Sequence, residues 1–163
     1  MDKILVLGLG NILLSDEGVG IHAIRLLRER YQFPQEVEIL DGGTLALDLL
    51  PYVEEADRLL IVDAIQMGAP PGTLVRLEGE QIPAMLSLKY SPHQIGLGDV
   101  LALAKLRGRC PSEIVLWGVQ VASLEAGLEL SPAVAAKLET LILNILGELK
   151  RWGVQPIKRA KSP

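Results

Sequence analysis

Glu17, Asp63 and His93 are three side chains in this sequence whose types and positions suit a shared metal ion. Two carboxylate oxygens and one imidazole nitrogen are good ligands for zinc, nickel or iron(II), and three protein ligands leave coordination positions open for another molecule. A metal bound in this way can polarise a carbonyl group or activate water. The sequence therefore predicts an enzyme whose working site is this metal-seeking cluster.

Each of the three residues also has a structural explanation. Glu17 and His93 lie at predicted helix starts, where the helix dipole favours an acid and disfavours a protonated histidine. The dipole alone is a sufficient explanation for Glu17, whereas His93 should stay neutral there, the form that binds metal. Asp63 directly follows the apolar run 59–62, where a carboxylate is costly to bury without a partner. Their joint placement favours the ligand interpretation.

Four further residues have weaker claims on the site. Asp16 is interpreted as a helix N-cap or as an acid that supports the ligands from behind. Asp41 follows the second predicted strand and is a secondary candidate. His22 lies about 140° round a helix from Glu17, so it is interpreted as an ordinary, partly buried helix residue. Cys110 is the only cysteine, and no histidine lies in a sequence pattern that pairs with it.

Other reaction classes find little support in the motifs. The sequence has no Gly-x-Ser-x-Gly and no His-Glu-x-x-His, so a hydrolase would depend on a metal or on activated water. The run from Gly8 to Leu13 is similar to a dinucleotide-binding turn, and Asp41 would then hold a ribose. Leu13 stands where that fingerprint needs its third glycine, and the helix begins too late.

The elements that must position these residues alternate along the chain. Strands are predicted at 3–8, 37–40, 58–62, 73–77 and 113–119, and helices at 17–31, 44–55 and 91–106, with a last helix that starts at Ser131-Pro132 and ends at Gly153. Such alternation predicts an α/β fold with a mostly parallel, about five-stranded twisted sheet covered by helices on both faces, a three-layer α/β/α arrangement. Ligands bind outside the carboxyl ends of the strands of such sheets, which is where the candidate residues fall.

Length and composition place bounds on the rest. The 163 residues are interpreted as one domain, 1–163, with 152–163 a loose tail. The net charge of -4 argues against a nucleic-acid partner, and no apolar run approaches the roughly 18 residues of a membrane span. The apolar segment 4–14 runs straight into Asp16-Glu17 without a cleavage site, so it is not interpreted as a signal peptide. We expect a cytoplasmic monomer.

Four ordered motifs resemble those of a known family, the hydrogenase maturation proteases. The segment from Gly8 to Gly20 resembles the opening motif of that family. Asp41-Gly42-Gly43-Thr44, Asp63-Ala64 and Ser91-Pro92-His93-Gln94 are similar to its later motifs, in the same order. The resemblance covers the chain from Lys3 to about Gly153.

The resemblance implies an endopeptidase that removes a C-terminal extension from the [NiFe] hydrogenase large-subunit precursor after nickel has been inserted. It maps the metal-contacting and catalytic residues onto Glu17, Asp63 and His93, and it places Asp41 near the cleft. The nickel would be supplied by the precursor, with no tightly bound cofactor in the enzyme. The resemblance also implies one antiparallel strand in the sheet, which we assign to Thr73–Leu77.

A second function uses the same three residues without catalysis. A nickel-binding or precursor-holding maturation factor would contact the precursor through Glu17, Asp63 and His93 and leave it uncut. The two functions differ in the mass of the precursor after incubation.

Overall fold

The fold is built on a five-stranded sheet. The computed structural model describes residues 2–87 and 96–160 of the chain. The sheet has the strand order β3-β1-β4-β6-β5, formed by β1 (Ile4–Leu9), β3 (Val37–Gly43), β4 (Arg58–Ile65), β5 (Leu74–Glu78) and β6 (Glu113–Gln120). Three neighbouring pairs are parallel, and β5 pairs antiparallel with β6. The prediction of a mostly parallel sheet with an antiparallel strand at Thr73–Leu77 is confirmed.

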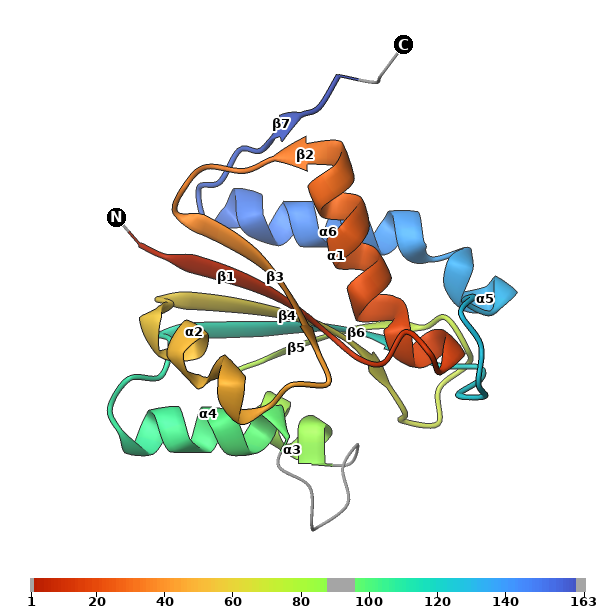
Figure 1. The fold of residues 1–163 in the computed structure, drawn as a ribbon, viewed down its shortest axis with the longest axis horizontal. Helices are drawn as coiled ribbons and strands as arrows, with labels where there is room; N and C mark the ends of the chain where they lie inside the picture. The colour runs from red at the N-terminus through yellow and green to blue at the C-terminus, as the bar shows by residue number, and fades with distance from the viewer. Residues whose placement is uncertain (1, 88–95, 161–163) are drawn as a thin grey trace.

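Helices cover both faces of the sheet, which confirms the three-layer prediction (Figure 1). On one face lie α1 (Val19–Arg30) and α6 (Leu138–Arg151). On the other lie α2 (Leu50–Glu55), α3 (Gln81–Ser87) and α4 (Leu97–Leu106). Short elements complete the chain: the 3-10 turns η1 (Ser15–Gly18) and η2 (Leu47–Leu49), the one-turn α5 (Pro132–Ala135), and a small pair of strands, β2 (Tyr31–Gln32) with β7 (Ile157–Lys158).

The core lies in two layers because the central strands are apolar on both sides. In β4, Leu60 and Val62 pack toward α1 and α6, while Leu59 and Ile61 pack toward α2 and α4. Successive side chains of a strand point to opposite faces, so a strand buried on both faces needs an unbroken apolar run. The run 59–62 supplies it.

The order of the strands creates a crevice at one edge of the sheet. From β1 the chain passes through α1 to β3 on one side, and it then returns to β4 on the other side of β1. The connections that follow β1 and β4 therefore diverge, and ligands bind at such switch points in open α/β sheets. The carboxyl ends of β1 and β4 are where the sequence places Glu17 and Asp63.

Two strands run further than predicted. The sequence ends the second and third predicted strands at Leu40 and Val62, because an aspartate follows each. The structure continues β3 through Gly43 and β4 through Ile65. In β4 the extra residues, Asp63 to Ile65, pair with the last residues of β6. Pairing with a neighbouring strand outweighs the low strand preference of aspartate.

Several helix boundaries also differ. The segment predicted as one helix from Glu17 begins as η1, and its α-helical part starts at Val19. The helix predicted to start at Ser91-Pro92 is described only from Leu97, and the extended backbone of Gly96 precludes a continuous helix through it. The Gly96 N–H donates to Asp99 Oδ2 at 2.9 Å, which caps α4 at this point. The helix α3 was not predicted.

The C-terminal segment is not a loose tail over its described part. Trp152 and Val154 are buried in the core. Beyond them Ile157 pairs with Gln32, and Arg159 Nε donates to Arg28 O at 2.9 Å. The prediction of a loose tail was wrong for the described residues 152–160. The polar and basic residues of the segment suggested a solvated tail, although Trp152 and Val154 are apolar.

No helix among the described residues has the length and apolar character needed to cross a membrane.

Candidate functional site

Asp63 lies inside β4, at the carboxyl edge of the sheet, and it is fully buried. It pairs in register with Gly118 of β6. Its Oδ1 accepts a hydrogen bond from the N–H of Ala64 at 2.8 Å. Strand alternation places its side chain on the face that carries α3 and α4, together with Ile61 and Ile65. Burying a carboxylate costs free energy unless neighbouring groups compensate for the lost hydration. Buried carboxylates of this kind are typical of functional sites.

Glu17 is brought to the same edge by the turn η1. It is half-buried, three residues before Gly20. The backbone of Gly20 packs so closely on the sheet that a Cβ there would lie 2.2 Å from Val62 O and 2.5 Å from Leu9 O. Only glycine allows this approach, which holds the start of α1 on the ends of β1 and β4. The structure thus brings Glu17 and Asp63 to one switch point.

Asp16 has a different task from its neighbour. It is fully buried, and it accepts four hydrogen bonds from the segment before α5. Its Oδ2 accepts from Ala122 N at 2.8 Å, Ser123 N at 3.1 Å and Ser131 Oγ at 2.8 Å, and its Oδ1 accepts from Ser131 N at 2.8 Å. Burial alone would raise the pKa of Asp16, but these hydrogen bonds outweigh it and bring the pKa below its ordinary value. The predicted N-cap role is wrong, since Gly18 precedes the first residue of α1.

The loop after β1 and the loop after β6 are fastened to each other by further hydrogen bonds. Ser15 N donates to Gly127 O, and Gly127 N donates to Leu13 O, both at 2.9 Å. Ser15 Oγ donates to Glu125 O at 2.6 Å. Ser15 has a positive φ of 52°, an uncommon conformation for a residue with a side chain. The two loops therefore form one ordered wall beside the switch point.

Asp41 lies at the same edge but on the other face of the sheet. It pairs with Gly8, and the register shifts at the next step because Leu9 pairs with Gly43. Gly42 is therefore the extra residue of a β-bulge. Asp41 Oδ1 accepts from Gly43 N at 3.0 Å, which supports the positive φ of Gly43. Alternation along β3 turns Asp41 toward the face of α1, away from that of Asp63.

The third predicted ligand, His93, lies outside the described residues. Within 2–87 and 96–160, no group of three or more His, Cys, Asp or Glu side chains lies close enough together to hold a metal ion. The triad of Glu17, Asp63 and His93 stays a prediction.

Gln120, at the end of β6, is a site residue that the sequence did not indicate. It is buried, and its Oε1 accepts from Met67 N at 2.8 Å and from Ala69 N at 3.3 Å. Its Nε2 donates to Val121 O at 3.1 Å and also to Gln66. Gln120 thereby fixes the loop that follows Asp63. The sequence shows only a single glutamine after an apolar run, and this pattern does not predict its hydrogen-bond partners.

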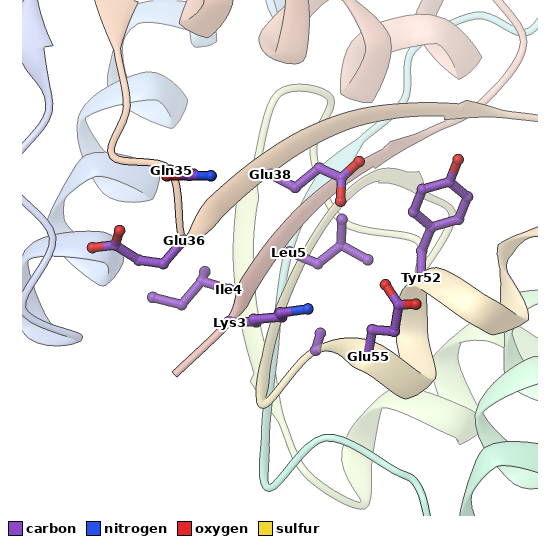
Figure 2. Close-up of a pocket in the computed structure, with 9 residues that line it drawn as sticks. Lys3, Ile4, Leu5, Gln35, Glu36, Glu38, Tyr52 and Glu55 are labelled. Carbon is purple, nitrogen blue, oxygen red and sulfur yellow. The ribbon is translucent and has the colours of Figure 1, made fainter. Parts of the chain in front are cut away.

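Two large cavities lined by described residues lie away from this edge. One, of about 410 Å³, opens at the amino end of β1 and β3, with Lys3, Glu38 and Glu55 in its lining (Figure 2). The other, of about 460 Å³, is lined by α4 and Cys110. Burial raises the pKa of the Cys110 thiol, so the thiolate is disfavoured. Cys110 precedes β6 and therefore lies at the amino edge of the sheet, opposite Asp63.

Comparisons with known proteins agree on one group. A family model described as hydrogenase maturation protease matches residues 21–148. The hydrogenase 2 maturation protease of Escherichia coli is 44% identical over 158 residues, covering 96% of each chain. The hydrogenase expression/formation protein HupD of Rhodobacter capsulatus is 43% identical over 161 residues, covering 98% of this chain and 77% of the relative. The solved structure of the hydrogenase maturating endopeptidase HybD from E. coli superposes with a TM-score of 0.92 at 43% identity, over 98% of this chain and 99% of that one.

Proposed function

The chain belongs to the hydrogenase maturation protease family, and on that premise we propose that it removes the C-terminal extension of a [NiFe] hydrogenase large-subunit precursor once nickel has been inserted. It is a peptidase, which makes the non-catalytic maturation factor the weaker alternative. We propose that it works in the cytoplasm, where the precursor is made.

The observation that carries this proposal is the buried carboxylate of Asp63 at the switch point, with Glu17 held at the same edge by the close packing of Gly20. The described part of this edge is formed by the loops that follow β1, β3, β4 and β6, and a protein substrate would approach the site along these loops. Carboxylate oxygens on a rigid strand and on a packed helical turn are preorganised to contact a positively charged group. A nickel ion carried by the precursor has that charge.

In the proposed reaction the nickel belongs to the substrate. Glu17, Asp63 and His93 would contact it and align the neighbouring peptide bond, so that much of the rate enhancement comes from positioning. The oxygen of a water molecule adds to the peptide carbonyl carbon, the C–N bond breaks, and a proton passes to the leaving amine. A carboxylate that is not engaged with nickel is suited to take the proton from the attacking water.

The direct test is to incubate the protein with a nickel-loaded precursor and to measure the mass of the precursor. We expect loss of the extension with the wild-type protein. Asp63→Asn, Glu17→Gln and His93→Ala should each reduce the rate by at least about a hundredfold, the scale on which a lost general base or charge contact acts. Retention of wild-type rates by all three variants, each folded by circular dichroism, would place the chemistry elsewhere.

Nickel dependence is tested by comparing the apo-precursor with the nickel-loaded precursor in the presence of a chelator that leaves the loaded centre intact. Because we propose that Glu17, Asp63 and His93 contact the nickel, the apo-precursor would lose the binding energy of that contact, and we expect cleavage of the loaded form alone. Equal cleavage of both forms would exclude nickel as the recognition element while leaving the peptidase activity in place.

A further inference from the structure

Large apolar side chains are exposed mainly at one edge of this molecule. Among the described residues with exposed large hydrophobic side chains, seven lie on the loops that follow the carboxyl ends of the strands: Leu13, Leu14, Leu45, Leu47, Met67, Leu124 and Leu128. Only four such side chains in the described part of the chain lie elsewhere: Tyr52, Leu106, Leu143 and Ile157. Exposed apolar side chains that gather at one place mark interaction surfaces, whereas scattered ones need no explanation.

Four of the seven sit on the two loops that are fastened together. Leu13 and Leu14 follow β1, and Leu124 and Leu128 follow β6; we refer to these four residues as the leucine rim. Leu14 forms an isolated β-bridge with Gly127, so the loops that carry the two pairs lie side by side. The hydrogen bonds of Asp16, Ser15 and Gly127 hold this backbone in place. The leucines are therefore exposed on an ordered wall, which reduces the entropy lost on binding.

In the described loops around the leucine rim, the charged side chains are all acidic. The segments 10–18, 41–49 and 120–131 each carry two Asp or Glu residues, and 63–73 carries one. None of these four segments contains a Lys or Arg, although the chain has 16 of them. Glu125 and Glu129 are exposed between and beside the rim leucines. A partner that fits this surface must therefore combine apolar side chains with Lys or Arg at its border.

The leucine rim is continuous with the candidate site. Leu14 precedes Glu17 by three residues, and η1 contacts β4, the strand that carries Asp63. A protein whose peptide bond approaches this edge of the sheet would pass close to the wall that carries the rim.

We propose that the leucine rim is the docking surface for the body of the large-subunit precursor, which would present there an apolar patch bordered by Lys and Arg. This inference rests on the proposed function for the identity of the partner. In this proposal, most of the affinity for the precursor comes from the leucine rim. The residues at the switch point contact the nickel and the scissile bond.

The experiment measures binding and cleavage separately with a nickel-loaded precursor. Binding is measured by titration calorimetry in an Asp63→Asn background, which keeps the precursor uncut. Leu13→Ser combined with Leu128→Ser should weaken binding at least about tenfold, since truncation of central interface residues typically has that scale. In the otherwise wild-type enzyme the same pair should raise KM and affect kcat much less.

A matched control is available on the same chain. Leu143 is 66% exposed on α6 and Leu106 is 85% exposed at the end of α4, against 64% for Leu128 and 58% for Leu13. Leu106→Ser with Leu143→Ser should bind and cleave as the wild type does. Equal weakening by the rim pair and the control pair, or by neither, would overturn the proposal.

Charge is tested by a second pair. Glu125→Lys with Glu129→Lys should slow association and make it less sensitive to salt, because exposed charges act mainly on the association rate. Glu38→Lys with Glu55→Lys, in the cavity at the opposite edge, is the control (Figure 2). If the association rate of Glu125→Lys with Glu129→Lys depended on salt as the wild-type rate does, the proposed charge complementarity would be contradicted.

The outcomes separate this proposal from the proposed function. A precursor that binds through the rim but is never cut by the wild-type protein would reject the peptidase assignment and support the docking surface. A precursor that is cut while the rim pair retains wild-type KM would reject the docking surface alone. A concentration-dependent dimer that the rim pair abolishes, seen by sedimentation without precursor, would assign the rim to a second copy of this chain and overturn the proposal.

Discussion

Asp16 and Glu17 are adjacent acids, yet the structure gives them opposite surroundings. Asp16 is enclosed by donors from the loop 121–131, whereas Glu17 is half-buried at the switch point. In the sequence they form one acidic pair, and the resemblance pointed to the second member as the one that contacts metal. The hydrogen bonds of Asp16 support that division, because they occupy its carboxylate in holding two loops together.

Asp16→Asn should destabilise the protein by about 2–4 kcal/mol, since an amide in place of the carboxylate leaves a donor facing donors in a buried place. Urea unfolding at neutral pH measures the change. Asp48→Asn, at an exposed aspartate, is the control and should stay within about 0.5 kcal/mol of the wild type. Equal stabilities of the two variants would mean that the hydrogen bonds of Asp16 contribute nothing net.

The same carboxylate gives a pH dependence with a defined sign. The pKa of Asp16 is lower in the folded protein than its ordinary value of 3.8, so the unfolded chain binds the proton more readily. Its contribution to stability is therefore present above about pH 4 and is lost as the pH falls through the lower, folded pKa. Between about pH 2 and 6, the unfolding free energy should change less with pH for Asp16→Asn than for the wild type. A larger change with pH for the variant would mean that the pKa of Asp16 is not lowered in the folded protein.

Residue types and spacing led to the prediction of Glu17 and Asp63 as ligands, and Asp63 was the stronger candidate because a carboxylate directly after an apolar strand is unusual. The role of both residues stays a prediction. Residue types and spacing were not enough for Ser131 and Gln120. Ser131 caps a helix as predicted, but this helix is the one-turn α5, and the predicted single helix to Gly153 is divided because α6 starts separately at Leu138. The hydrogen bonds of Ser131 to Asp16 join residues far apart in the chain. Such partners follow from the tertiary structure and leave no local pattern.

At the scale of elements, local patterns identified most strands and helices and missed their ends. The prediction of a helix start at Ser91 used a strong local capping pattern, and the described part of that helix is capped instead by Asp99. The helix α3 escaped prediction because Pro83 interrupts a short apolar segment. The ends of β3 and β4 are decided by pairing with β1 and β6, which no local window contains.

Gly20 is the position where close backbone packing holds the start of α1 at the candidate site. Gly20→Ala should separate the start of α1 from β1 and β4, because its Cβ would lie 2.2 Å from Val62 O, a backbone atom that cannot yield easily. We expect a loss of several kcal/mol in unfolding free energy, or a large loss of cleavage where the protein still folds.

The control for this change is Gly147→Ala in α6. A Cβ at Gly147 meets no atom within 4 Å, so alanine should keep or raise stability, by up to about 1 kcal/mol. Similar effects of the two substitutions would show that close packing at Gly20 is unimportant.

At the scale of the whole molecule, the two edges of the sheet differ in character. The carboxyl edge carries the acidic, leucine-bearing loops, and the amino edge carries the cavity with Lys3 and the connection to Cys110. The alternation of strands and helices predicted the fold class, and the net charge argued against a nucleic-acid groove, but a net charge averages over both edges. The net charge of -4 therefore gave no sign that the described loops 10–18, 41–49, 63–73 and 120–131 at one edge contain no Lys or Arg.

The C-terminal segment offers a test of what holds the molecule together. Removal of residues 156–163 eliminates β7, a two-residue pairing of exposed residues, and should lower unfolding free energy by about 1 kcal/mol at most. Trp152→Ala removes a buried side chain and should lower it by about 3–5 kcal/mol. Thermal unfolding of both variants measures the difference. A truncated protein that unfolds as readily as Trp152→Ala would make the small strand pair a main support of the fold.

The hydrogen bonds between Asp16 and its partners span 106 to 115 positions of the chain. During synthesis on the ribosome, the loop after β1 emerges early. Its hydrogen bonds to the loop after β6 can form completely only after Ser131 has been synthesised. Long-range closure of this kind comes late in folding because the entropy of the intervening chain must first be lost. The proposed docking surface thus forms only after Ser131 has been synthesised, and a fragment that ends before Ser131, although it carries both Glu17 and Asp63, would not form the wall that we propose binds the precursor.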